Sequence, residues 1–130
     1  MRPPTASRPL LLPRMLLIAA IASASGAFAS MTVAGDVFLS RLEDMPLAPG
    51  LSEDAAAGLS FDSASGRIVE AYARGNLTED QVLHFYQETL PQLGWTAENA
   101  RQYRRGGERL RLELTRSGQA LTVHYSLSPQ

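Results

Sequence analysis

Between Thr78 and Gly94, apolar side chains recur at the spacing of an α-helix. Thr78 is a favourable N-cap, and Gln81 three residues later completes a capping box. Glu79 and Asp80 follow in the first turn, where acidic groups favour the helix dipole, and Gly94 is a natural stop. At 100° per residue the apolar positions share one broad arc. The predicted buried arc contains Val82, Leu83, Phe85, Tyr86, Thr89, Leu90 and Leu93.

Ahead of the helix, the pattern changes to one of strands. Residues 59–61 alternate between apolar and polar, and residues 62–66 are rich in turn formers. Residues 67–74 then combine β-branched and aromatic side chains. This sequence of signals predicts a β-hairpin.

After the helix, Gly106-Gly107 is predicted to be a two-residue hairpin turn of type I′ or II′. This turn places Tyr103 opposite Leu110 and Arg104 opposite Arg109. Period-two alternation then assigns the tyrosine and the leucine to one face of the sheet and the two arginines to the other.

Ser117-Gly118 is predicted to be a second two-residue turn. Its register places Leu112 opposite Val123 and Arg111 opposite His124. Both hairpins assign the same apolar set to one face, and a one-residue slip would expose all of it. That set contains Tyr103, Leu110, Leu112, Leu114, Leu121, Val123, Tyr125 and Leu127.

These elements predict an α+β domain in which one helix packs on a curved antiparallel β-sheet, in the order β-β-α-β-β-β. Trp95 follows the helix stop directly and is expected to fill the junction between helix and sheet. The predicted structural core contains Phe85, Tyr86, Leu90, Leu93, Trp95, Leu112, Val123 and Tyr125.

The N-terminal segment has a different character. Three arginines and no acidic residue accompany the apolar run 15–22, and Ala27-Phe28-Ala29 is an A-x-A motif. This order predicts a signal peptide over residues 1–29, cleaved after Ala29, and hence an exported, periplasmic or secreted protein. A retained membrane anchor from Met15 to Gly35 and an organelle transit peptide are the alternatives.

Residues 30–57 are predicted to form an N-terminal arm, and residues 58–130 the α+β domain. Two prolines between Met45 and Leu51 forbid a regular helix there and disfavour a central strand. We expect the arm to lay Leu47 and Leu51 on the domain. The alternative is a flexible linker.

The amino-acid composition limits the kinds of functional site that the chain can form. The chain has no cysteine, which excludes disulfides, thiol nucleophiles and zinc–thiolate sites. Charge is uneven: residues 30–100 hold 3 arginines against 11 acids, whereas residues 101–130 hold 6 arginines against 2 acids. A basic C-terminal third is most simply a solvated face that complements the acidic remainder.

Motifs for catalysis, metals and cofactors are missing from the sequence. There is no G-x-S-x-G elbow, no phosphate-binding glycine loop, and the acidic residues lack calcium-loop spacing. His84 on the polar helix face and His124 on the outer sheet face are predicted to lie on opposite sides of the domain. We therefore expect a protein with no catalytic residue, metal or cofactor.

One cluster of polar side chains remains as a candidate binding site. The registers expose four basic side chains on the outer face: Arg104, Arg109, Arg111 and His124. Like charges directly opposite destabilise a sheet unless an anion compensates, and arginine binds carboxylate or phosphate bidentately. A solvated face neutralised by Glu108 and Glu113 is the competing interpretation. Nucleic acid is not expected, because these residues include no aromatic stacking platform.

The segment Phe85-Tyr86-Gln87-Glu88-Thr89-Leu90-Pro91-Gln92-Leu93-Gly94-Trp95 resembles a signature of uncharacterised small exported bacterial proteins: FY, a helix, LP-x-LGW, then a β-meander. The resemblance covers roughly residues 36–129, and it implies export and this fold but no activity. More distantly, the fold is similar to domains of envelope-assembly lipoproteins, whose lipidated cysteine this chain lacks.

Together these features predict an exported, non-catalytic interaction or accessory domain of the cell envelope. Its partner would be an unknown protein or an anionic envelope component. Two alternatives stay open. One is a small envelope hydrolase or ligand carrier with a pocket between arm and sheet near Tyr72, Trp95 and Tyr103. The other is a membrane-anchored subunit of a larger complex.

Overall fold

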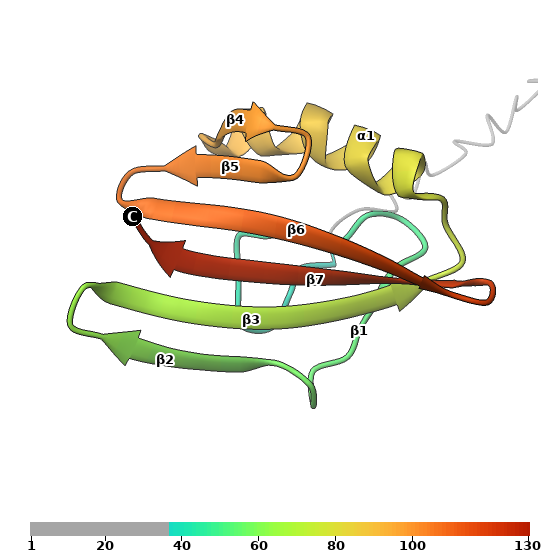
Figure 1. Cartoon of the computed structure of the whole chain (residues 1–130), viewed down its shortest axis with the longest axis horizontal. Helices are drawn as coiled ribbons and strands as arrows, with labels where there is room; N and C mark the ends of the chain where they lie inside the picture. Colours follow the sequence, from blue (N-terminus) through green and yellow to red (C-terminus); the bar gives the residue numbers. More distant parts are fainter. Residues whose placement is uncertain (1–36) are drawn as a thin grey trace, which may run out of the picture. The chain divides into compact units, whose positions relative to one another are not determined.

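The computed structural model describes residues 37–130. The predicted signal peptide and the first residues of the predicted arm lie outside this range. The described chain forms an α+β fold with one α-helix, α1 (Glu79–Thr89), a 3₁₀ turn, η1 (Leu90–Leu93), and an antiparallel sheet (Figure 1). The predicted combination of one helix with a curved antiparallel sheet is confirmed.

The sheet has seven strands in the order β1-β3-β7-β6-β5-β4, and β2 shares the outer edge of β3 with β1. Strands β3 and β7 are both interior strands and pair with each other, although the helix separates them in sequence. Two strands were not predicted: β1, which has only two residues, and β4, whose sequence Thr-Ala-Glu-Asn carries no strand pattern. The bounds are β1 (Ser52–Glu53), β2 (Leu59–Ser63), β3 (Gly66–Gly75), β4 (Thr96–Asn99), β5 (Gln102–Arg105), β6 (Glu108–Ser117) and β7 (Ala120–Pro129).

The start of α1 follows the sequence signal. The Gln81 backbone N–H donates to Thr78 Oγ1 at 3.1 Å, and the Thr78 N–H donates to Gln81 Oε1 at 2.9 Å. The predicted capping box is thus confirmed. Gly94, with φ of +88°, ends the helical segment as predicted.

The end of the helix departs from the prediction at Leu93, which is 37% exposed rather than part of the core. Pro91 has no backbone N–H, and the chain from Leu90 onward winds as a 3₁₀ turn. This turn has about three residues per turn instead of 3.6. The tighter winding rotates Leu93 out of the arc that an α-helix would have buried. Phe85 is partly buried and packs against the core, and the remaining predicted core residues are buried.

The predicted register of the first hairpin after the helix is confirmed. Arg104 faces Arg109, and Tyr103 faces Leu110. The second hairpin turns one residue later than predicted: Ser117 faces Ala120, and Gly118 with φ of +62° occupies the first turn position. Glycine is favoured where a type II′ turn requires positive φ.

This shift moves each β7 partner by two residues, so Leu112 faces Tyr125 rather than Val123. Because the side-chain period of a strand is two, both registers bury the same face. The apolar assignment is therefore confirmed, while individual cross-strand neighbours change.

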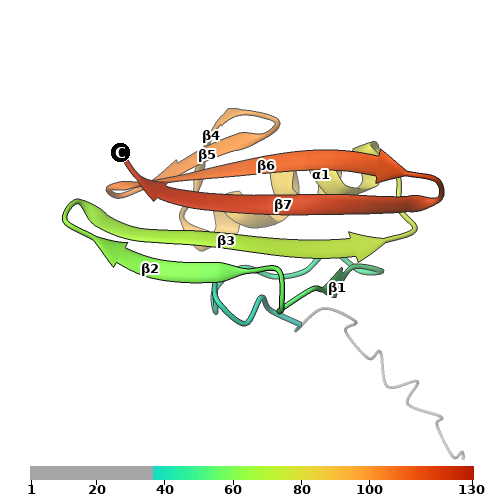
Figure 2. The same cartoon turned by 60° about the horizontal axis from the view of Figure 1, so that its bottom comes forward.

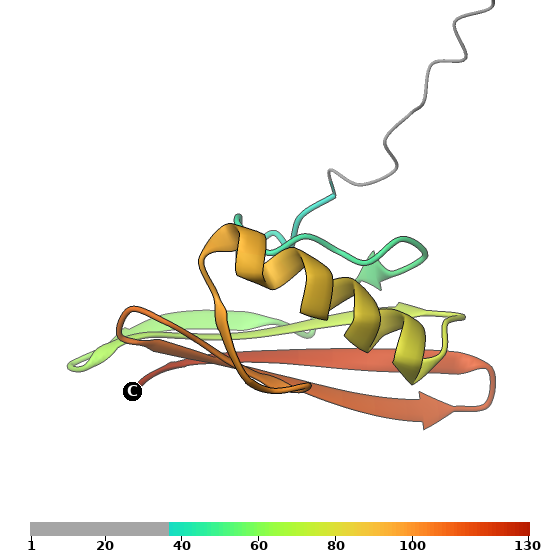
Figure 3. The same cartoon turned by 90° about the horizontal axis from the view of Figure 1, so that it is seen from above.

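The helix and the arm cover the same face of the sheet, which we call the inner face (Figure 3). Leu47 and Leu51 are 3% and 8% exposed. Four more apolar residues of the arm join them in a single core cluster with the sheet and helix: Leu39, Leu42, Met45 and Ala48.

Two buried tyrosine hydroxyls connect the arm, the helix and the sheet. Tyr86 on α1 donates its hydroxyl proton to the carbonyl oxygen of Pro46 at 2.8 Å. The hydroxyl groups of Tyr86 and Tyr125 lie 2.6 Å apart. Since Pro46 accepts the Tyr86 proton, Tyr125 is the donor within the pair. The arm thereby acquires a polar contact inside an apolar layer.

Burial raises the pKa of the Tyr86 and Tyr125 hydroxyls well above the ordinary value of 10.0. A folded-state pKa above the unfolded one gives stability that is complete below pH 10 and lost as pH rises. We expect the unfolding free energy to fall above pH 10 by up to about 1.4 kcal/mol per pH unit for each tyrosine. Urea unfolding at pH 8 to 11.5 measures this slope. Tyr86→Phe should make it shallower, and an unchanged slope would contradict the assignment.

Candidate functional site: the outer face of the sheet

The opposite face of the sheet, here the outer face, lies in front of α1 in Figure 2 and carries neither helix nor arm within the described residues. Alternation along the strands places the polar residues of β3, β5, β6 and β7 on it. The predicted binding residues Arg104, Arg109, Arg111 and His124 all lie on this face.

Three of them form a line that we call the arginine row, Arg104, Arg109 and Arg111. Their side chains are 52%, 45% and 52% exposed. Arg104 and Arg109 are directly opposite, which sets two like charges side by side. The row runs from β5 onto β6 and stays open to solvent.

Two carboxylates accompany the arginine row. Glu98 on β4 lies between the opposed pair, with Oε1 2.7 Å from Arg104 Nε and Oε2 3.9 Å from Arg109 Nε. Glu113 Oε1 lies 3.8 Å from Arg111 Nη1. Glu108, expected to neutralise this face, instead pairs with Arg67 at 3.1 Å.

The arginine row therefore has three guanidinium groups and two adjacent carboxylates. The distances from Arg109 and Arg111 exceed those of hydrogen bonds. Neither guanidinium therefore donates a hydrogen bond to its adjacent carboxylate. Each guanidinium has five N–H donors in a planar fork, so most of this donor capacity faces solvent.

His124 is not opposite Arg111, because the shifted hairpin places Ser126 there and Glu113 opposite His124. His124 Nδ1 lies 3.3 Å from Glu113 Oε2, and Nε2 contacts Glu70 on β3. Tyr72 stacks on the imidazole with ring centroids 4.4 Å apart. The histidine belongs to a carboxylate cluster beside the arginine row, not to the row itself.

The outer face ends in apolar side chains at β2. Leu59 is 45% exposed and Phe61 is 52% exposed, and Phe61 faces Ile68 across the strand pair. The face thus changes from apolar at β2, through the histidine cluster on β3 and β7, to the arginine row on β6 and β5.

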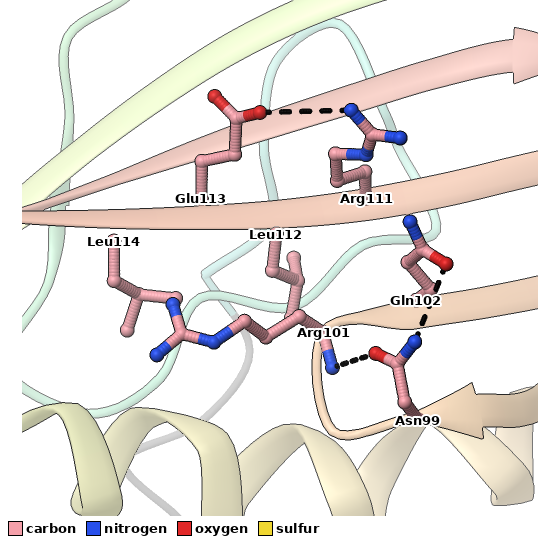
Figure 4. Close-up of a pocket in the computed structure, with 7 residues that line it drawn as sticks. All are labelled: Asn99, Arg101, Gln102, Arg111, Leu112, Glu113 and Leu114. Carbon is pink, nitrogen blue, oxygen red and sulfur yellow. Dashed lines mark hydrogen bonds and ion pairs between the residues drawn. The ribbon is translucent and has the colours of Figure 1, made fainter.

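A hollow that we call the β6 notch opens where the β4–β5 hairpin ends beside β6 (Figure 4). Its volume is about 440 Å³. In Figure 4 the side chains of Arg111 and Glu113 lie on one side of β6, whereas Leu112, Leu114 and the guanidinium of Arg101 lie on the side that faces α1. The lining residues are Asn99, Arg101, Gln102, Arg111, Leu112, Glu113 and Leu114.

The pocket considered between arm and sheet does not bring its three residues together. Tyr103 is fully buried on the inner face, whereas Tyr72 stacks with His124 on the outer face. Trp95 is 3% exposed beneath the guanidinium of Arg105, whose Cζ lies 4.3 Å from the ring centroid. Trp95 and Tyr103 pack in the core, as expected for a filled junction, and the sheet separates them from Tyr72.

The described residues offer few side chains for catalysis or metal binding. His84 is exposed on α1 and lies 3.2 Å from Glu88, away from His124. Residues 37–130 contain no group of three or more His, Asp or Glu side chains able to hold a metal ion. In the same range, no helix has the length and apolar character to cross a bilayer.

Comparisons with family models, curated proteins and solved structures find no match.

Proposed function

We propose that the protein is an exported, non-catalytic interaction domain that contacts an anionic partner through the arginine row. The observation that supports this proposal is the unused donor capacity of Arg109 and Arg111 on a face that neither the helix nor residues 37–57 of the arm cover. A partner carboxylate or phosphate would screen the opposed guanidiniums and accept bidentate hydrogen bonds. The signal-like pattern of residues 1–29 supports export to an envelope compartment rich in such groups.

The variant Arg104→Gln/Arg109→Gln/Arg111→Gln is expected to lose salt-sensitive binding to anionic probes. Poly-L-glutamate and phosphatidylglycerol vesicles are the probes, measured by co-sedimentation at low and at physiological ionic strength. Folding stability should change by about 1 kcal/mol or less, because exposed ion pairs contribute little. Thermal unfolding provides that check.

A matched control is Arg41→Gln/Arg67→Gln/Arg74→Gln, which removes the same charge away from the arginine row. The control should retain binding. If both triple variants lose binding equally, the attraction reflects net charge alone. If the arginine-row variant still binds, the proposed surface is wrong.

A further inference from the structure

Among the described residues, 37–130, strand β6 is paired along only part of one edge. It pairs with β7 over its whole length, but with β5 only from Glu108 to Arg111. The Leu112 N–H donates to the Arg101 carbonyl oxygen at 2.8 Å, and the β4–β5 hairpin leaves β6 there. Because edge-facing groups alternate along a strand, Leu114 and Arg116 direct N–H and C=O groups to the open side. Such an edge is a template for an added strand.

The open edge leads directly into the β6 notch. A strand antiparallel to β6 would enter beside Ser117 and run in the direction of β5, and the hairpin would stop it at Leu112. Figure 4 shows Arg111 on one side of β6 near this end point, and Arg101 on the other side, where its guanidinium lies beside Leu114 and the two leucines are directed toward α1. The chain direction and the stop together place the last residue of such a strand at the notch.

The charges along this edge favour a carboxylate at that position. Arg101 contacts Glu79 at 3.0 Å through Nη2, and the ion pair of Arg111 with Glu113 is longer, at 3.8 Å. Arg116 donates to the carbonyl oxygen of Leu77. Three guanidinium groups therefore border the edge against two carboxylates, Glu79 and Glu113, and Glu113 also contacts His124.

We propose that this edge binds the extended C-terminal tail of a partner protein by strand addition, with the terminal carboxylate between Arg101 and Arg111. Main-chain hydrogen bonds to Leu114 and Arg116 would hold the tail. Alternate side chains would point inward, an apolar one against Leu114 and an acidic one against Arg116. The inference deepens the proposed function and rests on it, since Arg111 belongs to both surfaces.

The test titrates ¹⁵N-labelled protein with the peptide acetyl-Ser-Glu-Thr-Leu-Thr, whose leucine would face Leu114. Amide shifts are expected over residues 112–117 and 99–102. Replacing the terminal carboxylate by an amide should weaken binding about tenfold or more, because it removes a charge-assisted hydrogen bond. Arg101→Gln should abolish this difference between acid and amide.

Two N-methylated peptides test the strand geometry. Methylating the leucine nitrogen blocks an amide that faces β6, so it should abolish binding. Methylating the central threonine nitrogen modifies an amide that faces solvent, so it should be tolerated. Equal effects of the two methyl groups, equal affinity of acid and amide, or no shifts with the free acid at millimolar concentration would each overturn the inference.

The variant Arg104→Gln/Arg109→Gln separates the two proposals, because these side chains do not border the β6 edge. It should bind the peptide normally while it weakens binding to the anionic probes. If the peptide does not bind, the strand-addition proposal is wrong, but the arginine row can still bind the anionic probes. If Arg104→Gln/Arg109→Gln/Arg111→Gln binds those probes normally, the arginine row is wrong, whatever the peptide does.

Discussion

A chain that begins at Gly58 is expected to be largely unfolded in water at 25 °C, although it contains every strand and helix predicted for the domain. It lacks β1 and the carbonyl of Pro46, which accepts the Tyr86 proton. Burial of each large apolar side chain contributes about 1.5–3 kcal/mol, and small domains have only about 5–15 kcal/mol in total. The removed core side chains are Leu39, Leu42, Met45, Leu47 and Leu51.

The matched control is the chain from Val37 to Gln130, which retains the arm and should fold. Far-ultraviolet circular dichroism and guanidinium unfolding compare the two. A cooperative transition in the shorter chain would show that the arm is an accessory to the core rather than part of it.

Trp95→Ala is expected to lower the unfolding free energy by about 3–5 kcal/mol, as truncation of a buried aromatic does. The indole is 3% exposed, and it supports the guanidinium of Arg105 from below. Arg105 in turn contacts Asp44 of the arm and the Leu93 carbonyl oxygen. The substitution therefore removes the ring that packs against Arg105, at the point where the arm, the end of the helix and β5 meet. Urea unfolding measures the loss.

Two companion variants define the origin of that loss. Trp95→Phe should cost less, because it retains a ring and removes an indole N–H that has no hydrogen-bond partner in the described chain. Leu93→Ala should change stability by about 1 kcal/mol or less, since Leu93 is 37% exposed. If Leu93→Ala destabilises as much as Trp95→Ala, the helix end is packed differently from the structure.

The elements with strong periodicity could be predicted from the sequence. The capping box at Thr78 and the apolar faces of β6 and β7 follow from local rules that act within a few residues. The turn at Gly118 was placed one residue early, because either of two adjacent two-residue turns preserves the buried face. Leu93 was misplaced because helical spacing was continued through a segment that Pro91 winds into a 3₁₀ turn.

The surroundings of the candidate site were less predictable. Glu98 meets Arg104 from β4, a strand whose pairing with β5 is irregular between Ala97 and Asn99, and no pattern of four residues reveals that strand or its bulge. Glu70 meets His124 across β3 and β7, a pairing that depends on the topology of the whole sheet. The alternation in residues 67–74 predicts that Glu70 points outward from the sheet. It does not predict that Glu70 contacts His124.

The pairing of β3 with β7 has a consequence for how the chain folds. Residues 69–75 pair with residues 121–127, so this interior pair of strands joins segments more than forty residues apart. Contacts this distant slow folding, because the entropy of loop closure is lost before they form. Chains emerge from synthesis with the N-terminal end first. The arm and β3 therefore remain without β7 as a partner until that strand has been synthesised, and the core closes only after that.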